Sequence, residues 1–93
     1  MMELAALHAT VRGHVQGVFY RAFVESHALE MNLTGYVRNL PDDSVEVVAQ
    51  GDRKKLEKLV ELLKKGPPAA KVENVEVVWG KFTGEFTQFG VKY

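Results

Sequence analysis

The sequence predicts an α+β fold, a ferredoxin-like α/β sandwich with two helices on one face of an antiparallel sheet. Two segments carry apolar residues at helical spacing, and the segments around them alternate apolar and polar residues as strands do. Their order along the chain is βαββαβ with an additional C-terminal strand. This split βαβ order packs both helices on one sheet face, and right-handed crossovers place the first strand near the middle of the sheet.

The first half of the chain supplies a strand, a helix and a hairpin. Residues 7–13 alternate between apolar and polar side chains, which predicts a strand with one buried face. Residues 21–31 place apolar side chains at i, i+4 and i+7, which predicts a helix. Residues 35–40 and 45–50 are typical of strands, and the Pro-Asp-Asp-Ser turn between them predicts a hairpin.

The second half supplies the clearest helix and two strands. Residues 53–65 place Leu and Val at i, i+3, i+4 and i+7, with Asp52 as the expected N-cap. Two lysines in the last turn complement the helix dipole, and the Gly-Pro-Pro sequence of residues 66–68 predicts the end of this helix. Residues 72–79 and 88–93 alternate again and predict the last two strands.

Composition limits the classes of protein to which the chain can belong. Ninety-three residues with 46% hydrophobic content predict one domain, spanning residues 1–93. Equal numbers of acidic and basic residues argue against binding of nucleic acid through bulk charge. The chain has no cysteine, no run of about 18 apolar residues and no N-terminal signal peptide, so we expect a soluble cytoplasmic protein without membrane segments.

The connection between the first strand and the first helix is a candidate anion site. Residues 13–21 contain two glycines and end with Arg21, close to the expected start of the helix. A helix N-terminus presents backbone N–H groups with partial positive charge, and an arginine fork matches two phosphate oxygens. Taken alone, the loop has an equally good structural explanation, in which Gly13 and Gly17 adopt unusual backbone angles and Arg21 forms a surface ion pair.

Other patterns for chemistry are weak. His8, His14 and His27 lack the spacing of a metal site, and Asp42 and Asp43 are better explained by turn formation than by catalysis. The loop matches neither the P-loop pattern nor the dinucleotide-binding pattern of glycines. The sequence therefore offers a candidate phosphate site with no evident catalytic base and no metal ligands.

Two linked motifs resemble those of the acylphosphatase family. Residues 13–21 read Gly-His-Val-Gln-Gly-Val-Phe-Tyr-Arg, which closely resembles the family motif G-x-V-Q-G-V-x-[FY]-R. Residues 35–39 read Gly-Tyr-Val-Arg-Asn, similar to the family's second motif, which ends in an asparagine. Segments 45–47, 50–51, 66–69 and 89–93 fit the same pattern, so the resemblance covers nearly the whole chain. Asn32 and Asp43 stand where the family often has glycine, and both residue types tolerate left-handed backbone angles.

The resemblance implies an enzyme that hydrolyses small acyl phosphates to a carboxylate and inorganic phosphate, without metal or cofactor. It implies that Arg21 and Asn39 are catalytic and that Asn39 orients the attacking water. We expect a monomer with no nucleic-acid or membrane partner. The resemblance also assigns phosphate binding to the loop amides and the motif arginine, here Val15, Gln16, Gly17, Val18, Phe19, Tyr20 and Arg21.

Two alternatives remain open at this point. Tyr36, Trp79 and Tyr93 could form an aromatic platform for RNA, although the neutral charge and the missing RNA-binding motif argue against it. The chain could also be an acyl-phosphate-binding domain that serves a larger assembly.

Overall fold

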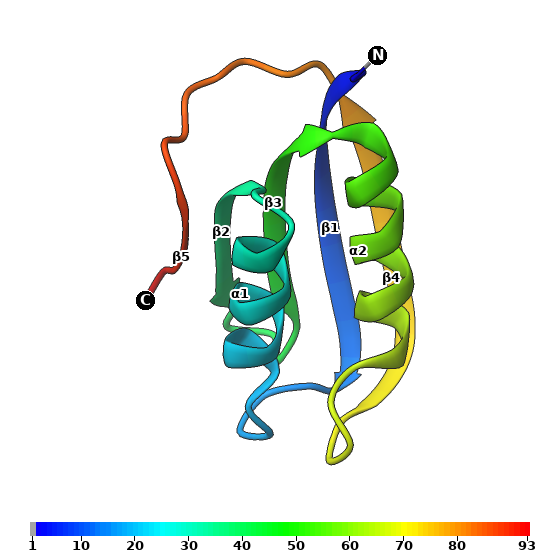
Figure 1. The fold of residues 1–93 in the computed structure, drawn as a ribbon. Coiled ribbons are helices and arrows are strands. Elements are labelled where there is room, and N and C mark those ends of the chain that lie inside the picture. The colour runs from blue at the N-terminus through cyan, green and yellow to red at the C-terminus, as the bar shows by residue number, and fades with distance from the viewer. Residues whose placement is uncertain (1) are drawn as a thin grey trace.

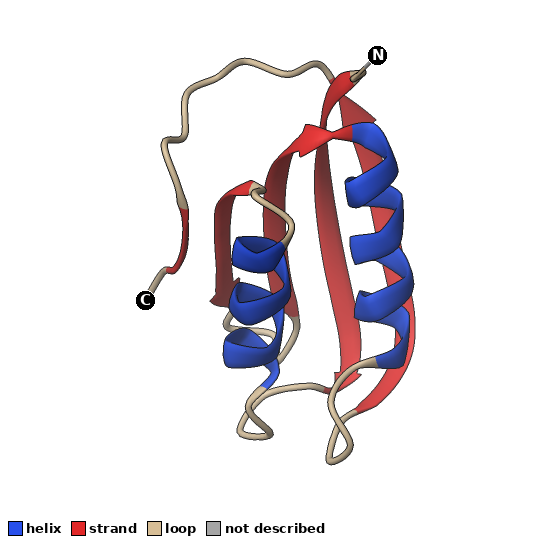
Figure 2. Cartoon of the chain, viewed as in Figure 1, coloured by secondary structure: helices blue, strands red, loops and turns tan. Residues whose placement is uncertain are grey.

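The computed structural model describes residues 2–93 as two helices packed against one face of a five-stranded sheet (Figure 1). The elements follow in the predicted order, with the irregular segments drawn in tan in Figure 2. They are β1 (Leu4–His14), α1 (Tyr20–Glu30), β2 (Thr34–Asn39), β3 (Val45–Asp52), α2 (Arg53–Lys65), β4 (Lys71–Gly80) and β5 (Phe89–Val91).

The sheet has the strand order β4-β1-β3-β2-β5, so β1 lies in the interior of the sheet as expected. β1 pairs antiparallel with β3 and β4, and β2 pairs antiparallel with β3. The sheet is antiparallel as expected among β1 to β4, and the additional C-terminal strand β5 makes it mixed, because β5 pairs parallel with β2. The segment between β4 and β5 crosses one end of the sheet before β5 descends beside β2, which makes this pair parallel (Figure 1).

This topology brings three chain segments to one end of the sheet. β1 and β2 both run antiparallel to β3, so their C-terminal ends point the same way, and β5 runs parallel to β2. The loop after β1, the end of β2 and the residues after β5 therefore lie toward the same end of the sheet, the end at which α1 begins (Figure 1). Any site built from these segments follows from strand direction rather than from closeness in sequence.

The core lies between the helices and the sheet. Leu56, Leu59 and Leu63 of α2 are fully buried, as their helical spacing predicts. The helices pack against the side chains that point to the inner face of the sheet. Burial of these apolar side chains supplies the main favourable free energy of folding. The buried apolar side chains of the strands are Ala5, Leu7, Ala9, Val11, Val37, Val45, Val47, Ala49 and Phe89.

The predicted turn chemistry is confirmed at several element ends. Asn32 and Asp43 adopt the left-handed conformation, with φ of 57° and 72°. α2 spans the predicted residues and ends at Gly66, whose φ is 68°. Asp52 does occupy the N-cap of α2, but its side chain makes no capping hydrogen bond.

The observed bounds of the elements differ most from the predicted bounds near the two ends of the chain. β1 begins three residues earlier than expected, and the final strand is limited to β5, shorter than the predicted 88–93. Within residues 2–93, neither helix has the length and apolar content needed to cross a bilayer.

Candidate functional site

The loop after β1, residues 15–19, is held in place by its side chains. Val15 and Val18 are buried in the core, at 1% and 7% exposure, so their side chains fix both halves of the loop. The carboxamide of Gln16 donates hydrogen bonds of 2.9 Å to the carbonyl oxygens of Leu40 and Ser44. The loop is therefore tied both to the core and to the turn of the β2–β3 hairpin.

Tyr20 fixes the point where the loop enters α1. Its side chain is 2% exposed, and its hydroxyl donates a 2.6 Å hydrogen bond to the carbonyl oxygen of Leu63 in α2. Burial raises the pKa of Tyr20 well above its ordinary value, so the hydroxyl stays protonated and keeps its role as donor. The start of α1 is thus anchored to the neighbouring helix.

The N-terminus of α1 has the character of an anion site. Its N-cap is Phe19, so no side chain within the described residues caps the first turn, which also has no acidic residue. The free N–H groups and the positive end of the helix dipole are therefore uncompensated. Gly17 and Phe19 both have positive φ, 73° and 63°, so the loop turns sharply before the helix begins.

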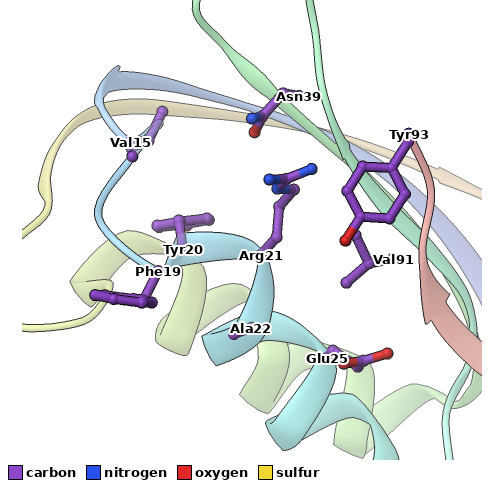
Figure 3. A pocket seen from close by; sticks show the side chains of 10 residues that line it. Val15, Phe19, Tyr20, Arg21, Ala22, Glu25, Asn39, Val91 and Tyr93 are labelled. Atoms are coloured by element: carbon purple, nitrogen blue, oxygen red, sulfur yellow. The ribbon is translucent and has the colours of Figure 1, made fainter.

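Phe19 is unusual for the position it occupies. A bulky residue with positive φ is strained by about 1–2 kcal/mol relative to ordinary backbone. Its ring gains little burial in exchange, because Phe19 is 83% exposed. It stands at one side of the pocket that opens in front of α1 (Figure 3). Strain without compensating packing is typical of residues at functional sites.

A pocket of about 410 Å³ opens at this end of the molecule and contains both Arg21 and Asn39 (Figure 3). Arg21 comes from the first turn of α1 and Asn39 from the last position of β2. Arg21 takes part in none of the ion pairs found in residues 2–93, and its guanidinium lies 5.0 Å from the ring centre of Tyr93. The surface ion pair considered for Arg21 is therefore absent from the described part of the chain, and the charge of Arg21 is available to a ligand.

Asn39 has an unpaired polar atom in the pocket. Within residues 2–93, its Oδ1 is buried and accepts no hydrogen bond from any protein group. A buried acceptor without a partner is costly, so proteins rarely leave one unless water or a ligand satisfies it. Figure 3 shows the carboxamide of Asn39 and the guanidinium of Arg21 pointing into the same space. The arrangement offers a cation, uncapped helix N–H groups and a free acceptor to one small anionic ligand and a water.

The structure brings most of the predicted site residues to this pocket. Gln16 and Val18 do not line it, since the first holds the hairpin turn and the second packs in the core. His14, the loop histidine, is exposed and does not line the pocket either. The predicted residues that line it are Val15, Gly17, Phe19, Tyr20, Arg21 and Asn39.

Sequence reasoning missed Ala22, Glu25, Val91 and Tyr93 as lining residues. Glu25 follows Arg21 by one helical turn, so the i, i+4 rule could have placed it on the same side of α1. Val91 and Tyr93 reach the pocket only because β5 runs parallel to β2. No local pattern in the sequence signals that pairing.

The structure does not support an aromatic platform for RNA. Trp79 pairs with Leu7, whose side chain is in the core, and therefore belongs to the helix-covered face of the sheet. Tyr36 of β2 and His8 of β1 lie opposite the same residue of β3, so both belong to the sheet face away from the helices. Tyr93 lies beside Arg21 at the pocket. The three aromatic residues thus belong to different surfaces and cannot stack successive bases.

A metal centre receives no support from side-chain placement. Residues 2–93 hold no group of three or more His, Asp or Glu side chains arranged to bind a metal ion. His8 instead contacts Glu46 at 2.7 Å on the sheet face away from the helices.

Comparison with known proteins identifies the family. The sequence model of the acylphosphatase family matches residues 7–91. The chain is 46% identical to an acylphosphatase of Pelotomaculum thermopropionicum, over 99% of this chain and 100% of that protein. It is 55% identical to one of Thermus thermophilus, over 84% and 89%. The crystal structure of an acylphosphatase from Bacillus subtilis superposes with a TM-score of 0.92 at 34% identity, covering 98% of this chain and 100% of that one.

Proposed function

The chain belongs to the acylphosphatase family, and from this membership and the pocket we propose a specific reaction and mechanism. The protein hydrolyses the carboxyl–phosphate bond of small acyl phosphates, giving a carboxylate and inorganic phosphate. The reaction uses no metal and no cofactor. The observation that carries the proposal is that one pocket holds the buried Oδ1 of Asn39, which accepts no hydrogen bond from residues 2–93, and the guanidinium of Arg21, which forms no ion pair with them.

The phosphoryl group is held by the N–H groups of the loop and the start of α1, together with Arg21. These donors carry positive charge that is not used within the described part of the chain. The anchored side chains of the loop keep the donors fixed, so little reorganisation accompanies binding. Fixed donors stabilise the charge on the phosphoryl oxygens as the bond to the leaving group breaks.

Asn39 orients the attacking water. Its Oδ1 accepts a hydrogen bond from the water, and its position at the end of β2 fixes the direction of attack. A carboxamide is no base at neutral pH, so the water proton passes to an oxygen of the phosphoryl group. Positioning, rather than proton abstraction by the protein, is therefore the role of Asn39.

The leaving group explains why so few catalytic side chains suffice. An acyl phosphate is a mixed anhydride, and the carboxylate that departs has a conjugate acid with a pKa of about 4. A leaving group this stable needs no general acid to protonate it. The pocket correspondingly has no histidine among its lining residues.

We also propose that residues 1–93 form one acylphosphatase domain that acts as a monomer. The match over the whole length of the Pelotomaculum relative supports the single domain. Arg21 and Asn39 of the same chain meet in one pocket, which supports activity without a second subunit. Light scattering of the active protein gives a mass near 10.4 kDa if this is correct.

The test is hydrolysis of benzoyl phosphate by the purified protein, with and without EDTA. We expect release of inorganic phosphate and benzoate at the same rate in both samples. A protein that does not hydrolyse benzoyl phosphate or acetyl phosphate contradicts the proposed reaction. Activity that EDTA removes and Zn²⁺ restores contradicts metal independence while leaving the reaction class in place.

A further inference from the structure

One part of the pocket lining has no task in the mechanism above. Ala22, Glu25 and Val91 line the pocket together with Tyr93, and they lie on the α1 and β5 side of it. In the view of Figure 3, Arg21 lies between Asn39 and Glu25. The phosphoryl group and the water occupy the region of the loop, Arg21 and Asn39. The remaining wall is therefore available to the acyl group of the substrate.

Glu25 is the only acidic side chain among the ten lining residues. It lies one helical turn after Arg21 on α1, so both side chains project from the same side of the helix. Despite this spacing, neither residue belongs to an ion pair in the described part of the chain. A glutamate side chain ordinarily carries a negative charge at neutral pH, and no ion pair within residues 2–93 offsets it here.

A carboxylate in a pocket for an anionic substrate needs a reason. It opposes the binding of any phosphate compound, so it is unfavourable for affinity alone. Its neighbours Ala22 and Val91 are apolar and suit the uncharged body of an acyl group. A repulsive group beside an attractive site is a common means of rejecting unwanted substrates.

We infer that Glu25 selects the acyl group by its charge. Acyl phosphates whose acyl group is uncharged or carries a cation are accepted, and those that carry a second carboxylate are disfavoured. This inference rests on the proposed acyl phosphate hydrolysis and adds the substrate class to it. Glu25 acts on specificity, and it takes no part in the bond-breaking step.

The expected effect follows from Coulomb's law. Charges separated by the width of such a pocket, in surroundings between water and protein surface, change a rate by about three- to tenfold. The effect decreases at 1 M salt, where the Debye length falls to about 3 Å. A substitution that only disturbs the fold shows neither the dependence on substrate charge nor this dependence on salt.

The experiment compares three aromatic substrates that differ at one ring position. They are benzoyl phosphate, 4-carboxybenzoyl phosphate and 4-(trimethylammonio)benzoyl phosphate, and kcat/KM is measured for wild type and Glu25→Gln. Relative to its effect on benzoyl phosphate, we expect Glu25→Gln to raise kcat/KM for the carboxylated substrate about three- to tenfold. We expect it to lower kcat/KM for the cationic substrate by a similar factor. Glu25→Lys extends both changes in the same directions.

Glu30→Gln is the matched control. Glu30 lies on the same helix, is exposed and does not line this pocket, yet its substitution removes the same charge. We expect kcat/KM of this variant to stay within about twofold of wild type on all three substrates.

Three outcomes overturn the inference. An equal change on all three substrates means that Glu25 acts through the phosphoryl group or Arg21, whatever the acyl charge. A large loss of kcat on all three means that Glu25 is a catalytic base. If the wild type hydrolyses none of them, the proposed reaction fails first and the inference fails with it, which distinguishes the two failures.

Discussion

Arg21 and Asn39 face one pocket although they lie 18 positions apart in the chain (39 − 21). Arg21 is placed by the first turn of α1 and Asn39 by the last position of β2, which ends beside the loop that precedes α1. The Gln16 side chain joins these two parts. Its carboxamide extends from the loop and donates hydrogen bonds to the carbonyl oxygens of Leu40, which follows Asn39, and of Ser44, at the other end of the β2–β3 turn. In the proposed mechanism, the elements that hold the phosphoryl group and orient the water are thus tied together by one side chain.

Gln16→Met tests this connection. The change removes both side-chain hydrogen bonds, while the carbonyl oxygens of Leu40 and Ser44 keep their backbone donors, the N–H groups of Asp43 and Leu40. Two hydrogen bonds of ordinary net strength are lost, so we expect the free energy of unfolding to fall by about 1–3 kcal/mol. Inorganic phosphate should also bind several-fold more weakly, because the loop donors are less well fixed. Gln88→Met, at an exposed position, is the control and should change neither quantity. Unchanged phosphate affinity in Gln16→Met shows that the loop is held by Val15 and Val18 alone.

Phe19 allows a test of backbone strain. Its φ of 63° suits glycine, and its ring is mostly exposed, so Phe19→Gly removes strain at little cost in burial. Phe19→Ala loses the same ring but keeps the Cβ that causes the strain. We expect Phe19→Gly to be more stable than Phe19→Ala by about 1 kcal/mol in urea unfolding. Equal stability of the two variants would mean that the position is not strained.

Glu46 gives the stability a defined dependence on pH. Burial alone would raise the pKa of Glu46, but hydrogen bonds from His8 and Arg38 outweigh burial and hold this pKa below its ordinary value. A carboxyl with a lowered pKa in the folded state stabilises the fold above its unfolded pKa, about 4.3, and this contribution is lost as the pH falls.

Glu46→Gln should therefore be less stable than wild type at pH 7, by about 1–2 kcal/mol. The difference should shrink as the pH is lowered below about 4, where the wild-type carboxyl takes up a proton. Thermal melts of both proteins from pH 7 to pH 3 measure this. Glu57→Gln serves as the comparison and should show little difference at any pH, because Glu57 is exposed and its ion pair is with Arg53 on the surface of the same helix. A difference for Glu46→Gln that stays constant with pH contradicts the assignment.

Much of this fold is predictable because its signals are local. Residues 53–65 carry a complete apolar stripe and are followed by Gly-Pro-Pro, which ends the helix. The structure confirms both predicted bounds, since α2 spans Arg53–Lys65. Asn32 and Asp43 adopt the left-handed angles that their side chains tolerate. Periodicity and turn chemistry act over a few residues, so one sequence is enough to read them.

The features that were not predictable depend on distant contacts. β5 pairs with β2 in parallel only after the chain has crossed one end of the sheet, and nothing in residues 81–88 signals that path. Val91 and Tyr93 consequently appear in the pocket without a sequence motif of their own. Gln16 belongs to the recognised motif, but its role as an anchor rather than a pocket wall is visible only in its hydrogen bonds.

The different roles that we propose for Arg21 and Asn39 predict two different losses. Arg21→Ala should weaken the binding of inorganic phosphate about 10- to 100-fold, because a charged, bidentate hydrogen-bond donor is removed. Asn39→Ala should bind phosphate within about twofold of wild type but lose about a hundredfold or more in kcat, because the water is no longer positioned. Arg12→Ala and Asn74→Ala, at exposed positions outside the pocket, are the matched controls and should retain full activity.

The most direct measurement is benzoyl phosphate hydrolysis by wild type, Arg21→Ala and Asn39→Ala side by side, together with phosphate binding by calorimetry. The mechanism predicts that the Asn39 variant binds phosphate normally and turns over substrate very slowly, whereas the Arg21 variant has lost phosphate affinity. Full activity of either variant, or loss of phosphate binding in Asn39→Ala with unchanged kcat, would contradict it.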